Sequence, residues 1–269
     1  MTFPDGPVIG LPPGDVTVGV VRIGRTVRRP HQPTSDGVAA YLAHLDARGF
    51  AGAPRYLGRD TQGRDVLTFL DGDVPGDPVD EWATVDAVLP GVARLVRRLH
   101  DASQGFDLPA GVTEPDRPAP QFPAGEPVLV AHRDVTPQNT VFRAGVASGL
   151  IDFDLSNRTT RALDLANTAM HWVPLCDPAD RAPAHAGIDV GQRLRLMLDA
   201  YGRDLFDGAG LLAAAEMRFA GSYAFMHWAA LHRGGGWARM WAEGVGDVIR
   251  RRIAWFADVR QELRDALDA

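Results

Sequence analysis

VLVAHRDVTPQNTVFR (residues 128–143), GLIDFD (149–154) and ALDLA (162–166) together decide the fold of this chain. Apolar runs typical of strands stand beside the polar residues, at residues 127–131, 140–142 and 150–151. A turn at residues 144–148 would fold the last two runs into a hairpin. We expect that hairpin to bring Asp134, Asn139 and Asp152 together.

These three residues carry the groups that phosphoryl transfer requires. A carboxylate receives the proton of the acceptor hydroxyl, while an amide oxygen and a second carboxylate hold Mg²⁺ on the phosphates. The spacing His-x-Asp-x-x-x-x-Asn, with a further Asp after the next strand, is the catalytic-loop pattern of kinase folds. A single Asp-x-x-x-x-Asn usually caps a turn. Three clusters in this order, each beside a strand-like run, favour the kinase-like interpretation.

The motifs at residues 132–139, 151–154 and 163–166 resemble the aminoglycoside phosphotransferase family, also called the phosphotransferase enzyme family. The resemblance runs from about residue 16 to the C-terminus and is specific only across the central stretch. It implies an α+β, two-lobed protein-kinase-like fold, with a small β-rich N-lobe and a larger, mostly helical C-lobe. The implied activity is transfer of the terminal phosphoryl group of ATP or GTP to a hydroxyl of a small molecule, for example an aminoglycoside-like antibiotic.

The same resemblance implies a role for each motif residue. Asp134 would be the catalytic base; Asn139, Asp152 and the auxiliary Asp154 would hold Mg²⁺; His132 and Asp164 would give structural support. Asp154 stands where protein kinases have the Gly of Asp-Phe-Gly, and no Ala-Pro-Glu segment follows. Both departures favour a small-molecule phosphotransferase over a protein kinase.

Two groups that anchor the nucleotide in kinase folds are missing. All 28 basic residues are arginine, so no lysine can contact the phosphates from the third strand. Arg28 is the preferred replacement because an apolar residue precedes it, and Arg29 is a close second; strand alternation lets only one face the site. The alternative is a pair of solvated arginines on an edge strand. The helix expected at residues 35–45 offers no Glu partner, and Val38 stands near its place. A nucleotide-binding pseudokinase or regulatory protein without efficient transfer is therefore the alternative function.

Composition limits the partners. A formal charge of −6 and a pI of about 5.7 argue against a nucleic-acid partner. Cys176 is the single cysteine, so the chain has no internal disulfide, which fits a reducing compartment. We find neither a secretory signal nor an apolar stretch that could span a membrane. We expect a cytoplasmic monomer or homodimer that binds a small-molecule acceptor.

Hydrophobic periodicity divides the chain into an N-lobe (residues 1–72) and a C-lobe (73–269). Strands are expected at residues 7–11, 15–24, 26–29, 54–57 and 65–70. Residues 10–14 form either the loop over the phosphates or an ordinary hairpin lead-in, and Phe69 and Leu70 lead into the hinge whose backbone meets adenine. Helices are expected at residues 82–103, broken at Pro90, and at 161–171. Residues 105–126 form a long loop, and residues 188–269 are overwhelmingly helical with a break at 234–236.

Overall fold

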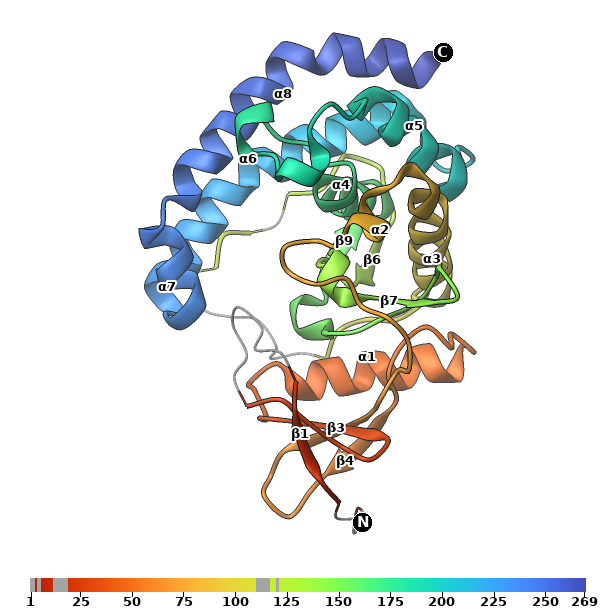
Figure 1. The fold of residues 1–269 in the computed structure, drawn as a ribbon, viewed down its shortest axis with the longest axis vertical. Helices are drawn as coiled ribbons and strands as arrows, with labels where there is room; N and C mark the ends of the chain where they lie inside the picture. Colours follow the sequence, from red (N-terminus) through yellow and green to blue (C-terminus); the bar gives the residue numbers. More distant parts are fainter. Residues whose placement is uncertain (1–2, 4–5, 12–18, 110–116, 120) are drawn as a thin grey trace.

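The computed structural model describes residues 3, 6–11, 19–109, 117–119 and 121–269. Its N-terminal part is an antiparallel five-stranded sheet with strand order β1-β2-β3-β5-β4 (Figure 1). The strands are β1 (Val8–Gly10), β2 (Val21–Ile23), β3 (Thr26–Arg29), β4 (Tyr56–Arg59) and β5 (Asp65–Thr68). Most of the predicted phosphate loop at residues 10–14, and the first half of the predicted strand at 15–24, lie outside the described residues.

β3 lies inside the sheet, between β2 and β5. Its two arginines are buried, with Arg28 2% and Arg29 7% exposed. The expectation of an edge strand with solvated arginines is therefore wrong. Long-range pairing decides which strand is central, and no local pattern in the sequence reports it.

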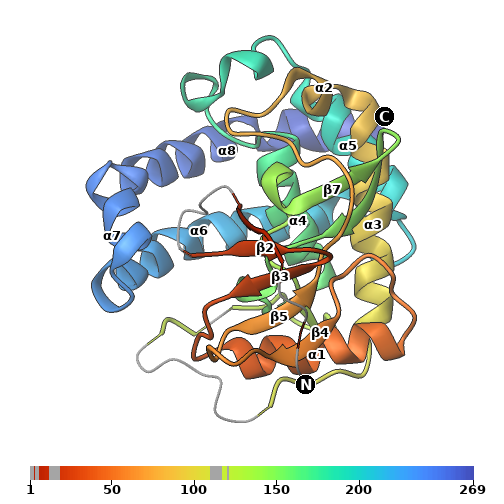
Figure 2. The ribbon, with the colours of Figure 1, turned by 60° about the horizontal axis from the view of Figure 1, so that its bottom comes forward.

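Helix α1 (Ser35–Ala47) runs along the side of the sheet that faces the helical part (Figures 1 and 2). It buries Val38, Tyr41, Leu42 and Leu45, the face that the sequence periodicity predicts. The hydroxyl of Tyr41 donates to the carbonyl of Val130, 3.0 Å away, which ties this helix to the strand before the catalytic loop.

The C-terminal part is mostly helical, as predicted, and the α+β arrangement is confirmed. Its helices are α2 (Glu81–Thr84), α3 (Leu89–Ala102), α4 (Arg161–Trp172), α5 (Val190–Tyr201), α6 (Gly208–His232), α7 (Gly235–Ala242) and α8 (Val245–Asp268). Helices α4, α5, α6 and α8 pack against one another around a shared apolar core that also takes in α1 and α3. Nothing in the described part of the chain is helical, long and apolar enough to cross a bilayer.

Two small hairpin-like pairs project from the helices and carry the polar clusters. Strand β6 (Val128–Ala131) pairs with β9 (Asn157–Thr160), and β7 (Thr140–Arg143) pairs with β8 (Val146–Leu150). β9 is not among the strands expected from the sequence, and β8 begins earlier than the expected run at residues 150–151. The turn between β7 and β8 is tighter than predicted because Ala144 and Gly145 both adopt positive φ, 50° and 75°.

Two helix boundaries also differ from the prediction. Pro90 lies in the first turn of α3 and does not interrupt it, which is where a helix tolerates proline. The last predicted helix is divided into α7 and α8 at Gly244, whose φ is 93°. A break between two helices is confirmed, but it lies at residues 233–234, because α6 ends at His232 and α7 begins at Gly235.

The segment after β5 is anchored to β7. Asp73 and Phe142 exchange two backbone hydrogen bonds of 2.8 and 2.7 Å. Gly72 precedes this anchor with φ 148°, and a Cβ there would stand 2.4 Å from the Phe142 carbonyl oxygen. Glycine is therefore required at this crossing. The lobe boundary at residues 72 and 73 stays a prediction.

Candidate active site

Asp134 follows strand β6 directly and stands at the centre of the loop that leads to β7. Its carboxylate accepts a hydrogen bond of 2.8 Å from the side-chain amide of Asn139. The same amide donates 3.0 Å to the Asp134 carbonyl. The sequence spacing thus becomes a direct contact between the predicted base and a predicted metal ligand.

His132 connects this loop to the strand that ends at Asp152. Its Nε2 lies 2.9 Å from the Ile151 carbonyl, and its Nδ1 accepts from the Asp134 amide at 3.3 Å. Burial lowers the pKa of His132, so the ring is neutral, with its proton on Nε2. The ring also packs edge-on against Phe153, with centroids 4.4 Å apart.

Asp164, on the first turn of α4, braces the loop from the other side. Its carboxylate accepts from the Arg133 amide at 3.0 Å and contacts His100 Nε2 at 3.0 Å. Arg133 has φ 62°, a conformation that non-glycine residues avoid unless their surroundings enforce it. The hydrogen bond to Asp164, which is 1% exposed, supplies part of that constraint.

The β7–β8 hairpin brings Asp152 to the same place. The Ile151 amide donates to the Asn139 carbonyl at 2.9 Å, so Asp152 follows at once beside the Asp134–Asn139 pair. Asp152 also has a left-handed backbone, φ 61° and ψ 69°. The structure therefore brings together Asp134, Asn139 and Asp152 around one point.

The carboxylates of Asp134, Asp152 and Asp154 repel one another at this point. Burial and the neighbouring Asp152 charge raise the pKa of Asp134 to about 7, against the opposing effects of Arg218 and Asn139. Burial and Asp154 raise the pKa of Asp152 to about 6, although 46% of its side chain remains accessible. Carboxylates that resist ionisation this strongly are concentrated at functional sites.

Arg29 is the cation from the N-terminal sheet that reaches these carboxylates. Its Nη2 donates to Asp154 Oδ1, and its Nη1 lies 3.8 Å from Asp152 Oδ1. Arg28 points elsewhere: it bonds Thr26 Oγ1 at 2.6 Å and lies 3.6 Å from Asp60. The sequence analysis prefers Arg28, whereas the structure places its second choice, Arg29, at the site.

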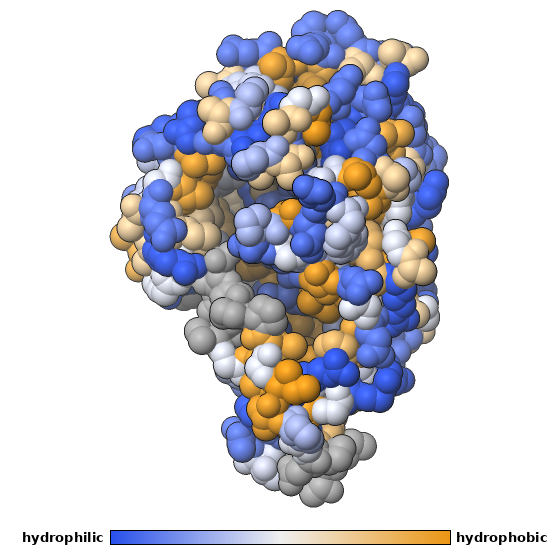
Figure 3. Space-filling view, viewed as in Figure 1, coloured by the Kyte–Doolittle hydropathy of each residue, from blue (hydrophilic) through white to orange (hydrophobic). Residues whose placement is uncertain are grey.

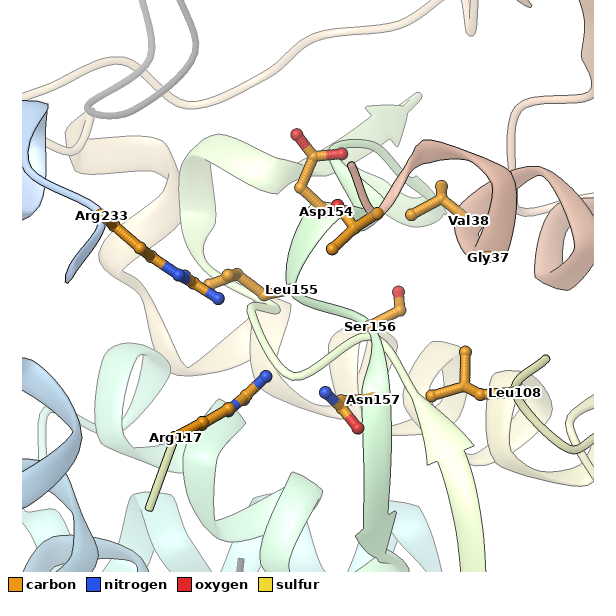
Figure 4. A pocket seen from close by; sticks show the side chains of 10 residues that line it. Gly37, Val38, Leu108, Arg117, Asp154, Leu155, Ser156, Asn157 and Arg233 are labelled. Atoms are coloured by element: carbon orange, nitrogen blue, oxygen red, sulfur yellow. The ribbon is translucent and has the colours of Figure 1, made fainter. Parts of the chain in front are cut away.

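Val38 occupies the position near which kinase folds carry the helix glutamate. It is buried and lines, with Asp154 and Leu155, a pocket beside the site (Figure 4). Arg29 thus pairs with Asp154, the residue that replaces the Gly of Asp-Phe-Gly. This ion pair links strand β3 to the segment that follows Asp152.

The donor atoms fit a hard divalent cation. No group of three His, Cys, Asp or Glu side chains in the described residues forms a metal site by itself. The candidate set instead combines the Asp152 carboxylate with the amide oxygen of Asn139, whose nitrogen is turned toward Asp134. Oxygen donors of this kind suit Mg²⁺, and a cation would relieve the repulsion between Asp152 and its acidic neighbours.

The predicted nucleotide-contacting residues Phe69 and Leu70 directly follow the inner strand β5. The Phe69 amide donates to the Arg25 carbonyl at 2.9 Å, and the Arg22 guanidinium lies 3.7 Å from the Phe69 ring centroid. Leu70 packs against β8, where a Cβ at Gly149 would come within 2.9 Å of its Cδ1. The Phe69 amide is thus already occupied by the sheet.

Sequence analysis misses two side chains that support the site. Asn167 on α4 donates to the Arg133 carbonyl at 2.8 Å. Arg218 on α6 donates through Nε to Asn167 Oδ1 at 2.8 Å. Arg218 lies 84 positions after Asp134 (218 − 134), and no local motif surrounds it, so only tertiary packing reveals it.

Comparisons with known proteins agree with this geometry. The profile of the phosphotransferase enzyme family matches residues 115–203. The trifolitoxin immunity protein of Rhizobium leguminosarum bv. trifolii is 33% identical over 189 residues, which are 68% of this chain and 70% of that protein. The chain belongs to the phosphotransferase enzyme family.

Solved structures confirm the kinase-like fold of this phosphotransferase. A choline/ethanolamine kinase family protein from Mesorhizobium loti superimposes with a TM-score of 0.57 at 17% identity, over 98% of this chain and 91% of that one. The GDP complex of aminoglycoside 2′-phosphotransferase-IIIa gives 0.57 at 13% identity, over 93% of each chain. These similarities concern the fold, and the residues above carry the chemistry.

Proposed function

We propose that this phosphotransferase moves the terminal phosphoryl group of ATP or GTP to a hydroxyl of a small molecule. The observation that carries the proposal is the convergence of Asp134, Asn139 and Asp152 from two separate strand ends. The matched family and the GDP-bound structural neighbour support a nucleotide as the donor.

In the proposed reaction the acceptor hydroxyl oxygen forms a bond to the terminal phosphorus, and the bond from that phosphorus to the bridging oxygen breaks. The nucleoside diphosphate leaves, and the hydroxyl proton passes to Asp134. Asn139 and Asp152 would hold Mg²⁺, which neutralises charge on the phosphates when bound. Arg29 would exchange its contact with Asp154 for the phosphates, to which its guanidinium offers two parallel donors.

Transfer is tested with the full chain, ATP or GTP, and a panel of acceptors analysed by mass spectrometry. The panel includes the ligand classes named for relatives and neighbours: choline, streptomycin, gentamicin, a macrolide and trifolitoxin. We expect Mg²⁺-dependent turnover that EDTA abolishes, and a loss of roughly 10²- to 10⁴-fold in kcat for Asp134→Ala. Asp46→Asn, at an exposed position of α1, is the control. Unchanged turnover in Asp134→Ala would refute the role of Asp134.

A nucleotide-binding protein without transfer is the second candidate. It is favoured by the Arg29–Asp154 ion pair, which engages the only β3 cation beside the site's carboxylates among the described residues. The same experiment separates the two functions. Nucleotide binding without any Mg²⁺-dependent turnover would support this candidate over the enzyme.

A further inference from the structure

Three arginines near the catalytic loop have no carboxylate within ion-pair distance among the described residues. They are Arg133 on the loop, Arg218 on α6 and Arg252 on α8. Arg218 bonds only neutral oxygens, those of Asn167 and Ser222. Arg252 contacts the thioether of Met170 at 3.2 Å and the ring of Phe219 at 5.7 Å, and its Nε is buried without a partner.

Other buried arginines of this protein are neutralised. Arg193, 1% exposed, bonds Asp86 at 2.5 Å and the carbonyl oxygens of Thr84 and Trp172. Arg29 has Asp154 and Asp152. A half-buried guanidinium without a counter-ion costs free energy, so a cluster of three such groups favours the binding of an anion.

The three cations repel one another. Burial, together with Arg133 and Arg252, lowers the pKa of Arg218 to about 10. Burial, Arg252 and Arg218 lower the pKa of the adjacent His171 to about 3, which keeps that ring neutral. The acidic groups that act on Arg218 are Asp134 and Asp164. Asp164 is occupied by the Arg133 amide and His100, and Asp134 by Asn139.

One member of the cluster, Arg218, is linked to Asp134. Arg218 is joined to the catalytic loop through Asn167 and acts directly on the Asp134 charge. Arg218 and Arg252 come from helices of the C-terminal part, whereas Arg29 comes from the N-terminal sheet. Arg218 thus acts on Asp134 from the helices, whereas Arg29 contacts Asp152 and Asp154 from the sheet and is the residue proposed for the phosphates.

Two further arginines line a pocket next to the cluster. Figure 3 shows a recess between the N-terminal sheet and the helices. Arg117 and Arg233 line a pocket there with Leu155 and Asn157, and Figure 4 shows both guanidinium groups directed into it. Arg117 is close enough to Arg133 to lower its pKa. The pocket lining therefore includes Arg117 and Arg233 together with the carboxylate of Asp154.

Two carboxylates of the C-terminal part are neutralised by arginines of α8. Asp180 forms an ion pair of 2.5 Å with Arg251, and Glu216 lies 3.3 Å from Arg260. A polycationic acceptor would meet unpaired arginines beside Asp134 in place of acidic side chains. The charge distribution therefore selects against it.

We infer that the acceptor is a small organic anion with a hydroxyl group, whose carboxylate or phosphate is bound by Arg218 and Arg252. The inference rests on the proposed phosphoryl transfer and specifies its substrate class. Two guanidinium groups can bind one oxyanion with charge-assisted hydrogen bonds. An acceptor whose anionic group is bound by Arg218 would present its hydroxyl to Asp134.

The test compares acceptors that share a skeleton and differ in charge. Glucuronate and glucose 6-phosphate are the anions, glucose is neutral and glucosamine is the cation; citrate and glycerate extend the anion series. Binding to the full chain saturated with Mg²⁺ and ADP is measured by calorimetry at low and high NaCl, and phosphorylated products are measured with ATP and GTP. We expect only anions to bind, and their affinity to fall as NaCl rises.

Substitutions on α6 and α8 assign the effect to the cluster. Arg218→Gln and Arg252→Gln should each weaken anion binding by about tenfold or more, while Arg252→Lys, which keeps the charge, loses less. The KM for the nucleotide should stay within about twofold, because these residues face the acceptor. Arg250→Gln is the matched control, since Arg250 lies on the same helix, is 61% exposed and is paired with Asp247.

The outcomes distinguish the inference from the proposed function. Failure of every anion to bind, equal binding of glucosamine, or an effect of Arg218→Gln confined to the nucleotide KM would overturn the anionic acceptor. Phosphorylation of a cationic acceptor would also overturn it while leaving the transferase function intact. Salt-sensitive anion binding lost in the arginine variants, in a protein without Mg²⁺-dependent turnover, would retain the anion site and reject the transfer.

Discussion

Burial and the neighbouring carboxylate of Asp152 oppose the ionisation of Asp134. Burial and the charge of Asp152 keep its pKa near 7, which is the range where a general base works best. Asn139 donates a single hydrogen bond to its carboxylate, and Arg218 adds a more distant positive charge. The site is therefore electrostatically strained in the absence of ligands.

This strain predicts a pH-dependent stability. An unfolded Asp has a pKa near 3.8, so between about pH 4 and pH 7 the unfolded chain releases a proton that folded Asp134 retains, and folding stability falls as pH rises. Asp134→Asn removes this loss and keeps an acceptor for Asn139. We expect the variant to melt about 2–6 °C above the unsubstituted protein at pH 8 in EDTA, corresponding to about 1–2 kcal/mol, and a smaller difference at pH 5.

Thermal denaturation at the two pH values measures this effect. Asp46→Asn, at an exposed position of α1, should leave the melting temperature unchanged at both. Equal melting temperatures for Asp134→Asn and the unsubstituted protein at pH 8 would show that the charge of Asp134 does not destabilise the folded state.

Arg29 predicts the second residue-level result. Arg29→Lys keeps the charge but loses the two-pronged donor, so the KM for ATP or GTP should rise about 3- to 10-fold. Arg29→Met should cost more, because Asp152 and Asp154 then lose their cation. Arg64→Lys, at a position paired with Asp60 on the β4–β5 turn, is the control. An unchanged KM in Arg29→Lys would exclude a phosphate contact.

At this scale the sequence predicts motif residues well and their partners poorly. Asp134, Asn139 and Asp152 are recognisable because the chemistry fixes their spacing and strands bring them together. The choice between Arg28 and Arg29 depends on which face of β3 meets the site, and alternation alone does not specify that face. Arg218 and Arg252 lie on helices in sequence surroundings that resemble any other helix.

At the scale of elements, the loop after β6 depends on helix α4 for its shape. Asp164 accepts from the Arg133 amide and contacts His100, while Asn167 holds the Arg133 carbonyl. One turn of α4 therefore binds both the amide and the carbonyl of Arg133, whose φ is positive.

Asp164→Ala should therefore destabilise the protein by about 2–4 kcal/mol, because it leaves two buried donors without acceptors. Activity should fall as the loop relaxes. Urea denaturation and kcat measure the two effects. Asp199→Ala removes a carboxylate of α5 from an exposed pair with Arg203, which lies just after the helix, and should cost about 0.5 kcal/mol or less. Equal losses in the two variants would contradict the bracing role.

Elements with strong local patterns are predicted and those made by pairing are not. The buried face of α1 and the break after α6 follow from periodicity and glycine content. Strand β9 has the sequence Asn-Arg-Thr-Thr, which reads as a turn, and it becomes a strand because β6 offers its edge. The sequence predicts that Pro90 breaks a helix. In the structure Pro90 instead lies in the first turn of α3, because the helix begins at Leu89.

For the whole molecule, the site combines residues from the N-terminal sheet and from the helical part. A nucleotide with Mg²⁺ would contact Arg29 of the sheet and Asn139 and Asp152 of the helical part at once. Binding to the folded state alone should stabilise it by about 2.7 kcal/mol at a ligand concentration 100 times Kd.

We expect ADP or GDP with Mg²⁺ to raise the melting temperature by several degrees, and EDTA to abolish most of the shift. Hydrogen exchange should slow in β3 and in the 132–139 loop together. Asp152→Asn is the comparison, and it should lose the Mg²⁺-dependent part of the shift. A shift independent of Mg²⁺ in the unsubstituted protein would contradict the assigned metal ligands.

The architecture is predictable because family motifs and hydrophobic periodicity both indicate a sheet followed by helices. The strand order and the central place of β3 arise from contacts between distant residues, which composition does not report.

The anchor between Asp73 and Phe142 limits how the two parts can move. The two backbone hydrogen bonds hold the segment after β5 against β7. Gly72 lies too close to Phe142 to accept a side chain. If the N-terminal sheet moves relative to the helical part when a nucleotide binds, we expect the backbone to rotate before Asp73, over the few residues between Phe69 and Gly72.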